Sequence, residues 1–268
     1  MVRYFLTAAV LAAACAGSAG AQTNRLTPEQ KAAGWRLLFN GKDMSGWDAP
    51  RKKTPPGDAW TIEDGCLKAR ANPSITEDLF TTDTFRDFEL TFSWRISPGG
   101  NSGLKYRIQD HVFLLDEPVS HFEDLVNRTL THRRPDRPAK GQDYVIGFEY
   151  QAIDDVENED AKAGPLHAAG ALYDISPAAR NATRPVGQFN QSRLVLRGNH
   201  VVHWLNGEKV VEADLDSPEA AAHIAKRWGQ DSPVYELMAK QPKRDCPISL
   251  QNHDADAWFR DIKIRPLK

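Results

Sequence analysis

The sequence has almost no excess of charge of either sign. Its 268 residues include 34 lysines and arginines and 36 aspartates and glutamates, which gives a net charge of −2 with neutral histidines. Proteins that bind nucleic acid or anionic membranes usually present a strongly basic surface, and this composition does not indicate such a surface. We therefore expect a small, neutral or weakly polar ligand and no nucleic-acid partner. The composition leaves the oligomeric state open.

Long hydrophobic runs are also missing. The most apolar stretch, Phe5 to Ala14, is too short to span a bilayer, so we expect no membrane span. Arg3 precedes it and Ala19-Gly20-Ala21 follows it, a pattern typical of a cleaved secretory signal. We predict a periplasmic or secreted protein. Cys15 leaves a lipoprotein anchor as the alternative, although the residue three places before it is Ala where such signals usually carry Leu.

Cysteine is scarce beyond this signal. The remaining chain has only Cys66 and Cys246. An oxidising compartment would allow a disulfide between them, but the sequence does not show whether they lie close together. Both the paired and the free states stay open at this point.

Recognisable metal-ligand spacing is absent. The histidines show no His-Glu-x-x-His pattern, and the acidic run from Asp154 to Lys162 lacks the spacing of a known calcium loop. We expect a solvated loop there, and neither a metal nor a cofactor. A structural role is predicted for six histidines: His111, His121, His132, His167, His200 and His203.

Short strands joined by turns make up most of the chain after the signal. The clearest alternation runs from Phe85 to Ser97, where every second residue is a large apolar one. Hairpin turns are expected at Glu63-Asp64-Gly65 and at Gly198-Asn199. Many strands, few helices and regular turns predict an all-β sandwich of two antiparallel sheets. Its expected core includes Phe88, Leu90, Phe92, Trp94 and Ile96, with Trp47, Trp60 and Trp204.

Two short helices and one irregular segment interrupt this pattern. Thr27, Pro28 and Gln30 form a capping box that predicts a helix start, and Ser217 to Arg227 predicts a second helix. Residues 110–143 contain prolines and a further short helix over 122–130, and we interpret them as a surface insertion or a flap over a groove. We divide the chain into a signal (1–21), an N-terminal segment (22–34) and one domain (35–268).

A strand from Ile146 to Ile153 has two unlike faces. Phe148, Tyr150 and Ala152 alternate with Glu149 and Gln151. Burying a carboxylate and an amide without partners costs several kcal/mol, so these two residues suit the polar floor of a groove.

Polar side chains recur at alternate positions of two other strands. Lys105, Arg107 and Gln109 form one row, and Gln251 and His253 form another. If these strands are neighbours of the Glu149 strand, one surface combines a carboxylate, two cations, amides and an imidazole. Such a mixture suits sugar hydroxyls and developing charge, but spacing alone does not establish the adjacency.

Six motifs follow one another along the chain: Asn101-Ser102-Gly103-Leu104-Lys105-Tyr106-Arg107, Phe148-Glu149-Tyr150-Gln151-Ala152-Ile153-Asp154, Gly170-Ala171-Leu172-Tyr173, Val201-Val202-His203-Trp204-Leu205-Asn206-Gly207, Ile248-Ser249-Leu250-Gln251-Asn252-His253 and Phe259-Arg260-Asp261-Ile262. In this order they resemble those of the 3-keto-disaccharide hydrolase family, over about Trp35 to Leu267. Two departures concern substrate contacts more than the fold: Gly187-Gln188-Phe189-Asn190 replaces the usual Gly-Glu-Trp-Asn, and the 110–143 insertion is longer than usual.

This resemblance implies a concanavalin A-like jelly roll that cleaves glycosides carrying a ketone at C3. The ketone acidifies the C2 proton, so a base can form an enediolate, the anomeric substituent can leave, and water can add at C1. Such a site needs a base, an oxyanion partner and an acid at the leaving oxygen.

We assign roles to nine residues on this basis. Glu149 or His253 is the base or acid, and Lys105 and Arg107 stabilise the oxyanion. The predicted substrate-binding residues are Asn101, Gln151, Asp154, Gln251 and Tyr173.

Simpler interpretations stay open beside these roles. Glu149 could form a cross-strand ion pair, His253 could lie in a loop, and Arg260 could pair with a carboxylate. At the level of function, the alternatives are a non-catalytic carbohydrate-binding module and a conventional two-carboxylate glycosidase.

Overall fold

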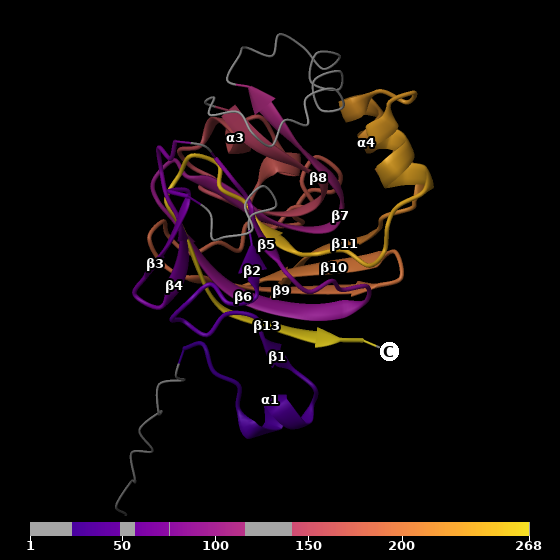
Figure 1. Ribbon diagram of the computed structural model, residues 1–268. Coiled ribbons are helices and arrows are strands. Elements are labelled where there is room, and N and C mark those ends of the chain that lie inside the picture. Colours follow the sequence, from indigo (N-terminus) through magenta and orange to yellow (C-terminus); the bar gives the residue numbers. More distant parts are fainter. Residues whose placement is uncertain (1–22, 49–56, 75, 116–140, 268) are drawn as a thin grey trace, which may run out of the picture.

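Two antiparallel β-sheets face each other, which confirms the predicted fold class (Figure 1). The computed structural model describes residues 23–48, 57–74, 76–115 and 141–267, and the side chains of 111–115 and 141–144 are not described. Within this part of the chain, no helix has the length and apolar character needed to cross a membrane.

The larger sheet has eight strands, and its middle is formed by the strand predicted from the clearest alternation. Phe88, Leu90, Phe92, Trp94 and Ile96 are all buried on its inner face, as expected. In order, the strands are β11 (Glu208–Asp214), β10 (His200–Leu205), β9 (Asn190–Arg197), β6 (Phe88–Ile96), β13 (Ala257–Pro266), β4 (Cys66–Ala69) and β3 (Trp60–Glu63), and β1 (Arg36–Leu37) pairs with β13.

The smaller sheet has five strands and carries the polar rows. It brings together segments that are far apart in the sequence, because the short β12 inserts between β5 and β7. In order, its strands are β2 (Trp47–Asp48), β5 (Leu79–Thr81), β12 (Ser249–Leu250), β7 (Asn101–Leu115) and β8 (Gly141–Ile153).

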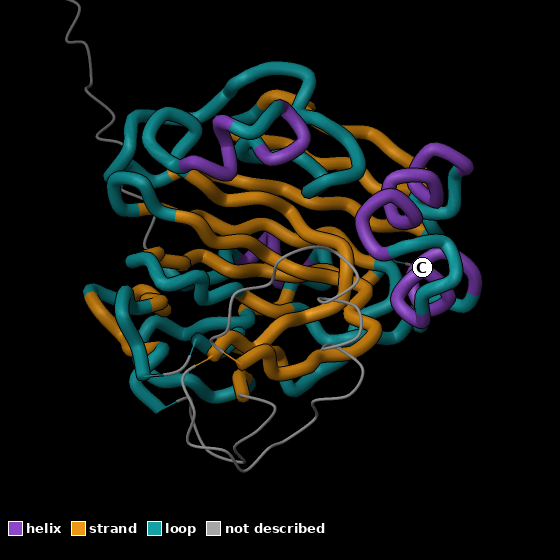
Figure 2. Tube along the Cα trace, turned by 90° about the horizontal axis from the view of Figure 1, so that it is seen from above, coloured by secondary structure: helices purple, strands orange, loops and turns teal. Residues whose placement is uncertain are grey.

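Helices are short and lie at the margins of the sheets. Two of the predicted helices are confirmed: α1 (Pro28–Ala32) has the Thr27 and Gln30 capping box, and α4 (Pro218–Trp228) begins after Ser217. Figure 2 shows the layered strands with α4 at one side of the sandwich. The sequence did not predict α3 (Glu159–Lys162), the 3₁₀ turn η1 (Pro165–His167), α5 (Pro233–Tyr235) or the π-helix η2 (Glu236–Lys240).

The segment that was expected to be irregular begins and ends as regular strand. β7 continues to Leu115 and β8 begins at Gly141, and these ends pair with each other. Residues 110–115 and 141–143 are therefore strand rather than loop. The helix expected over 122–130 lies outside the described residues.

Several expectations about individual side chains can be compared with the structure. Cys66 and Cys246 are buried free thiols, so they form no disulfide. Trp47, Trp60 and Trp94 are core residues as predicted. Trp204 is an exception, because it is only half-buried on β10 and lies under the Arg193 guanidinium, 4.1 Å from the ring centre.

An irregularity in β7 interrupts the expected alternation. Between the pairs Tyr106–Phe148 and Asp110–Ile146, β7 has residues 107–109 where β8 has only Gly147. A Cβ atom at Gly147 would lie 3.1 Å from the Tyr106 carbonyl oxygen, which explains why glycine occupies this position.

Arg107 sits at the start of this bulge with a φ of +51°, a left-handed conformation that is uncommon for a side chain of this size. Within the bulge, Arg107 leaves the face that carries Lys105, and Ile108 packs with Phe80 and Val145 in an apolar cluster separate from the main core. Beyond the bulge the alternation resumes, since Asp110 pairs with Ile146 as Tyr106 pairs with Phe148.

Candidate active site

Polar residues from three neighbouring segments meet on the face of the five-stranded sheet that points away from the other sheet. Lys105 of β7 lies directly opposite Glu149 of β8, and Ser249 of β12 lies opposite Lys105 on its other side. Gln251 follows β12 and continues the pairing, since its N–H donates to the Gly103 carbonyl at 2.9 Å. The predicted adjacency of these rows is therefore confirmed for Lys105, Glu149 and Gln251.

Lys105 is the centre of a buried charged cluster. Its Nζ lies 3.3 Å from Asp78 Oδ2 and 4.0 Å from Glu149 Oε2. The Gln251 amide bridges Lys105 and Glu149 when its nitrogen faces Glu149: the nitrogen then donates to Glu149 Oε1 at 3.2 Å, and the oxygen accepts from Lys105 Nζ at 3.1 Å. We assign this amide orientation because it satisfies both neighbours.

Glu149 is held in a state suited to proton transfer. Burial raises the pKa of its carboxyl from the ordinary value of 4.5 to about 7; the Lys105 ammonium opposes this rise and the Asp78 carboxylate adds to it. Its side chain keeps 12% of its surface exposed, so a ligand can reach the carboxyl. A group with a pKa near neutrality can accept a proton and later return it.

Gly103 makes the close approach of Glu149 to the sheet feasible. A Cβ atom at this position would lie 2.0 Å from Glu149 Oε1. The glycine therefore leaves the space that the carboxyl group occupies.

Two amide oxygens on the same face have no hydrogen-bond partner among the described residues. They are Asn101 Oδ1 and Gln151 Oε1, and both side chains are buried. Asn101, Gly103 and Lys105 alternate along β7, and Glu149 and Gln151 alternate along β8. Buried acceptors without donors are rare in folded proteins, so these two amides are the polar groups on this face whose hydrogen-bonding capacity the described residues leave unused.

Tyr173 borders the site from the segment after β8. Its backbone N–H donates to the Glu149 carbonyl at 3.0 Å, and its hydroxyl donates to Asp160 Oδ2 at 3.0 Å. His167 stacks on the Tyr173 ring, with 4.8 Å between ring centres, and contacts Asp160 Oδ1 at 2.7 Å. The pKa of Tyr173 is raised, first by burial, so its hydroxyl stays a proton donor.

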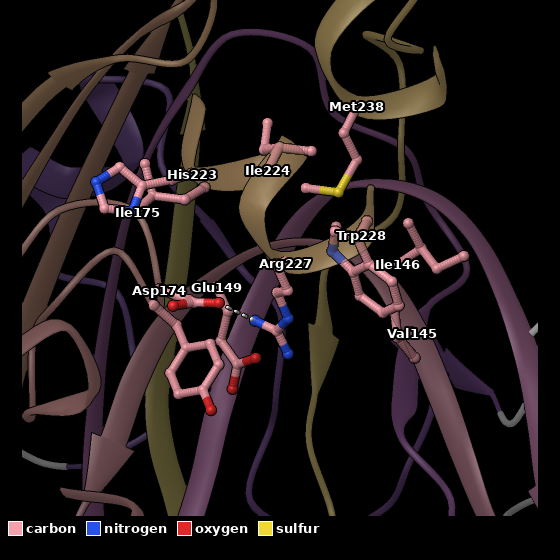
Figure 3. A pocket seen from close by; sticks show the side chains of 12 residues that line it. Val145, Ile146, Glu149, Asp174, Ile175, His223, Ile224, Arg227, Trp228 and Met238 are labelled. Carbon is pink, nitrogen blue, oxygen red and sulfur yellow. Dashed lines mark ion pairs between the residues drawn. The ribbon is translucent and has the colours of Figure 1, made fainter. Parts of the chain in front are cut away.

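Helix α4 adds a cation that the sequence analysis missed. Arg227 lines a recess together with Glu149 and Tyr173, and its guanidinium lies 3.6 Å from Asp174 Oδ2. Figure 3 shows Glu149, Asp174 and Arg227 facing the same recess, with Trp228 and Met238 on the apolar wall. The arginine lies at the end of an amphipathic helix, where a basic residue is ordinary, so the sequence carried no signal for this role.

Asp78 is the second residue that the sequence analysis missed. It immediately precedes β5 and is almost completely buried. An acidic residue next to a three-residue strand has no distinctive pattern, and its contact with Lys105 depends on β5 and β7 lying on either side of β12.

The structure separates Arg107 from this cluster, so the prediction that it shares a row with Lys105 is wrong. Because of the bulge, its side chain lies beside the turn between β9 and β10. There it donates from Nη2 to the Gly198 carbonyl, and Nη2 lies 3.6 Å from Asp87 Oδ1. Gln109 is likewise engaged elsewhere, since its side-chain oxygen accepts from the Lys243 N–H at 2.6 Å.

Asp154 is also occupied by backbone contacts. Its Oδ2 accepts from the Gly99 N–H at 2.8 Å, and its Oδ1 accepts from the N–H groups of Val156 and Glu157 at 2.9 and 3.3 Å. Burial opposes ionisation, but these donors prevail and lower the pKa of Asp154. The geometry indicates a turn-forming role rather than the predicted contact with substrate.

His253 follows the site strand and is exposed. Although its side chain keeps contact with water, the surrounding protein removes enough solvent to lower the pKa of His253, and the Lys105 charge lowers it further. Its role as acid or base stays a prediction.

Clusters of metal-ligand side chains are absent from the part of the chain that the structure describes. Among these residues, no group of three or more histidine, cysteine, aspartate or glutamate side chains is arranged to hold an ion. The expectation that the protein binds no metal stays a prediction.

Known proteins share both the sequence and the fold. A family model for a 3-keto-alpha-glucoside-1,2-lyase-like domain matches residues 34–265. A Bacteroides thetaiotaomicron protein named 3-keto-disaccharide hydrolase is 31% identical over 249 residues, which span 88% of this chain and 79% of that protein.

Solved structures of similar proteins have the same fold. A candidate glycosyl hydrolase from Parabacteroides distasonis is 25% identical, with a TM-score of 0.69 over 92% of this chain and 100% of that one. A second structure from the same organism is also 25% identical, with a TM-score of 0.57 over 87% of this chain and 99% of its own. The family match extends over most of the sequence and a named relative is similar along nearly all of it, so this chain belongs to the family of 3-keto-alpha-glucoside-1,2-lyase-like domains.

Proposed function

We propose that this protein cleaves 3-keto glycosides, including 3-keto disaccharides, by elimination and hydration. The observation that carries the proposal is the buried Glu149 carboxyl, with a pKa of about 7, beside the Lys105 ammonium. Membership of the family and the name of the Bacteroides thetaiotaomicron relative support the substrate class.

The first step is removal of the C2 proton by the Glu149 carboxylate. The electrons of the C–H bond move toward the C3 ketone and form an enediolate. Lys105 is the cation available to stabilise the oxygen that becomes negative, because its ammonium lies in the same cluster. The side chains of Asn101 and Gln151 lie on the same face as Glu149 with unused acceptors, and we assign them to orienting the sugar hydroxyls.

The second step expels the anomeric substituent. The enediolate electrons return to re-form the ketone, a C1–C2 double bond forms, and the C1–O bond breaks. The leaving oxygen takes up a proton from Tyr173, His253 or solvent. Water then adds at C1. The proton on the Glu149 carboxyl exchanges with solvent and a proton is delivered to C2, so that the whole sequence amounts to hydrolysis.

The test compares a 3-keto disaccharide with its unoxidised parent. We expect cleavage of the ketone substrate only, because the parent lacks an acidic C2 proton. In D₂O, the recovered 3-keto sugar should carry deuterium at C2, which a conventional glycosidase would not introduce. Cleavage of both sugars would support the conventional enzyme, and binding without cleavage would support the carbohydrate-binding module.

We also propose that the protein is exported and that the signal is removed after Ala21. The Arg3, apolar and small-residue pattern supports this proposal. N-terminal sequencing of protein from the periplasm and the medium tests it. Cleavage immediately before a lipid-modified Cys15 would replace it with the lipoprotein alternative.

A further inference from the structure

Asp78 holds the Lys105 ammonium from the side opposite to Glu149. Its Oδ2 lies 3.3 Å from Lys105 Nζ, closer than the 4.0 Å between Lys105 Nζ and Glu149 Oε2. The carboxyl also accepts from the Ser249 hydroxyl at 3.4 Å and from the Asn252 N–H at 3.3 Å. Two buried carboxylates therefore compete for one ammonium, and Asp78 has the shorter contact.

The two carboxylates differ in the number of hydrogen-bond donors around them. Three donors surround the Asp78 carboxylate, whereas Glu149 has the more distant Lys105 and the Gln251 amide. Hydrogen bonds donated to a carboxylate stabilise its ionised form. Burial raises the pKa of Asp78 as well, but its donors oppose that rise. The ionised form of Asp78 therefore has more hydrogen-bond donors than that of Glu149.

The other charges that act on Glu149 come from separate elements. Arg227 on α4 favours ionisation of Glu149, and Asp160 on α3 disfavours it. Each already has a partner: Arg227 lies near Asp174, and Asp160 bonds to the Tyr173 hydroxyl. The exposed His253 also lies within reach of the Lys105 charge.

We propose that Asp78 is a positioning residue whose carboxylate draws the Lys105 ammonium away from Glu149, so that Glu149 stays basic enough to remove a substrate proton. This inference rests on the proposed function. It assigns a role in controlling the base, Glu149, to a residue from a different part of the sheet. Lys105 thereby remains a fixed cation for the oxyanion, and does not become a tight ion-pair partner that would weaken the base.

The test titrates the Glu149 carboxyl by ¹³C NMR, with the signal assigned by its loss in Glu149→Gln. In Asp78→Asn, Lys105 is released toward Glu149 and a neighbouring negative charge is lost. We expect the midpoint of the Glu149 titration to fall by at least about one pH unit. The matched control is Asp256→Asn, which removes a carboxylate 3.2 Å from Lys68 on the other sheet and should leave the midpoint unchanged.

An unchanged or higher midpoint in folded Asp78→Asn would overturn the inference. If that variant does not fold, Lys105→Met is compared with the double variant Asp78→Asn, Lys105→Met, which leaves no unpaired buried ammonium. The double variant should titrate at lower pH than Lys105→Met, because repulsion from Asp78 is gone, and equal midpoints would contradict the role of Asp78.

The two proposals can fail separately, because the NMR readout needs no substrate. A shifted midpoint in a protein that does not cleave 3-keto glycosides would refute the proposed function and leave the charge arrangement intact. In an active enzyme, the low-pH limb of kcat/KM should move in Asp78→Asn by the same amount as the NMR midpoint.

Discussion

Glu149 determines the pH dependence of the proposed reaction. A general base works only when ionised, and burial raises the pKa of this carboxyl to about 7. We therefore expect kcat/KM to fall about tenfold for each pH unit below this value and to level off above it. Initial rates on a 3-keto disaccharide, measured from about pH 5 to about pH 9, check this expectation.

The same experiment distinguishes this carboxyl from an ordinary one. Glu149→Gln should lower kcat/KM by about 100-fold or more, whereas Glu236→Gln, which changes a half-buried glutamate paired with Lys240, should behave like the unmodified protein. A rate that already levels off near pH 4.5, the ordinary value for glutamate, would contradict the buried environment.

Gly103 provides a second prediction for a single residue. In Gly103→Ala, the new methyl group would overlap with Glu149 Oε1, which lies 2.0 Å from the Cβ position. The carboxyl must move, so we expect kcat/KM to fall by at least about tenfold, since small displacements of a reacting group are costly. Circular dichroism should show a folded protein, and unchanged kinetics would mean that Glu149 does not need this position.

Sequence parity identified part of the site at the level of single residues. Lys105, Glu149 and Gln251 were predicted to share a surface, because residues at alternate positions of a strand point to the same face of the sheet. Asp78 and Arg227 were not predicted. Asp78 lies just before a short strand and Arg227 near the end of a helix, where charged residues are ordinary, and the contacts that matter come from other elements.

The bulge in β7 shows how one element can overturn a pattern. Strict alternation placed Arg107 beside Lys105, but three residues of β7 lie opposite Gly147 alone, and Arg107 turns toward Asp87. The sequence did carry a signal, since a glycine inside a strand often marks a bulge. The strand that carries the bulge, and the residues within it, became clear only from the pairing register of β7 with β8.

Arg107→Met tests the separation of this residue from the active site. The substitution leaves the Gly198 carbonyl without its donor and Asp87 without its cation. We expect the free energy of unfolding to fall by about 1–3 kcal/mol, while kcat/KM stays within about threefold. Urea denaturation and steady-state kinetics provide the two readouts.

Lys105→Met is the matched comparison for that experiment. Removing this cation should abolish measurable turnover, because it stabilises the oxyanion in the proposed reaction. A similar loss of activity in folded Arg107→Met would show that Arg107 takes part in the reaction and would contradict its separation from the active site.

At the scale of the whole molecule, His203 links stability to pH. Its ring is fully buried between the sheets, where Nδ1 lies 3.0 Å from the Gly170 carbonyl and Nε2 lies 3.1 Å from the Tyr106 hydroxyl. Burial lowers the pKa of His203 from 6.5 to about 4. The neutral ring therefore contributes stability above pH 6.5, and this stability is lost as the pH falls toward 4.

We expect His203 to account for a loss of about 3 kcal/mol over that interval. His203→Gln should be less stable at neutral pH, because its bonds are altered, but its stability should depend less steeply on pH. Urea titrations at pH 7 and at about pH 4.5 measure the difference. The control is the exposed His200, whose pKa is raised by Asp214; His200→Gln should not reduce the acid slope, and an equal slope in His203→Gln would contradict the assignment.

The sequence by itself determined the two-sheet architecture, the helix starts and the polar face of β8, because these depend on alternation and capping between residues close together in the chain. Only the tertiary structure decided that β12 lies between β5 and β7, that the bulge removes Arg107, and that Asp78 and Arg227 approach Glu149. The physical reason is that burial, and with it the proton affinity of the carboxyl, depends on which distant strands and helices surround it.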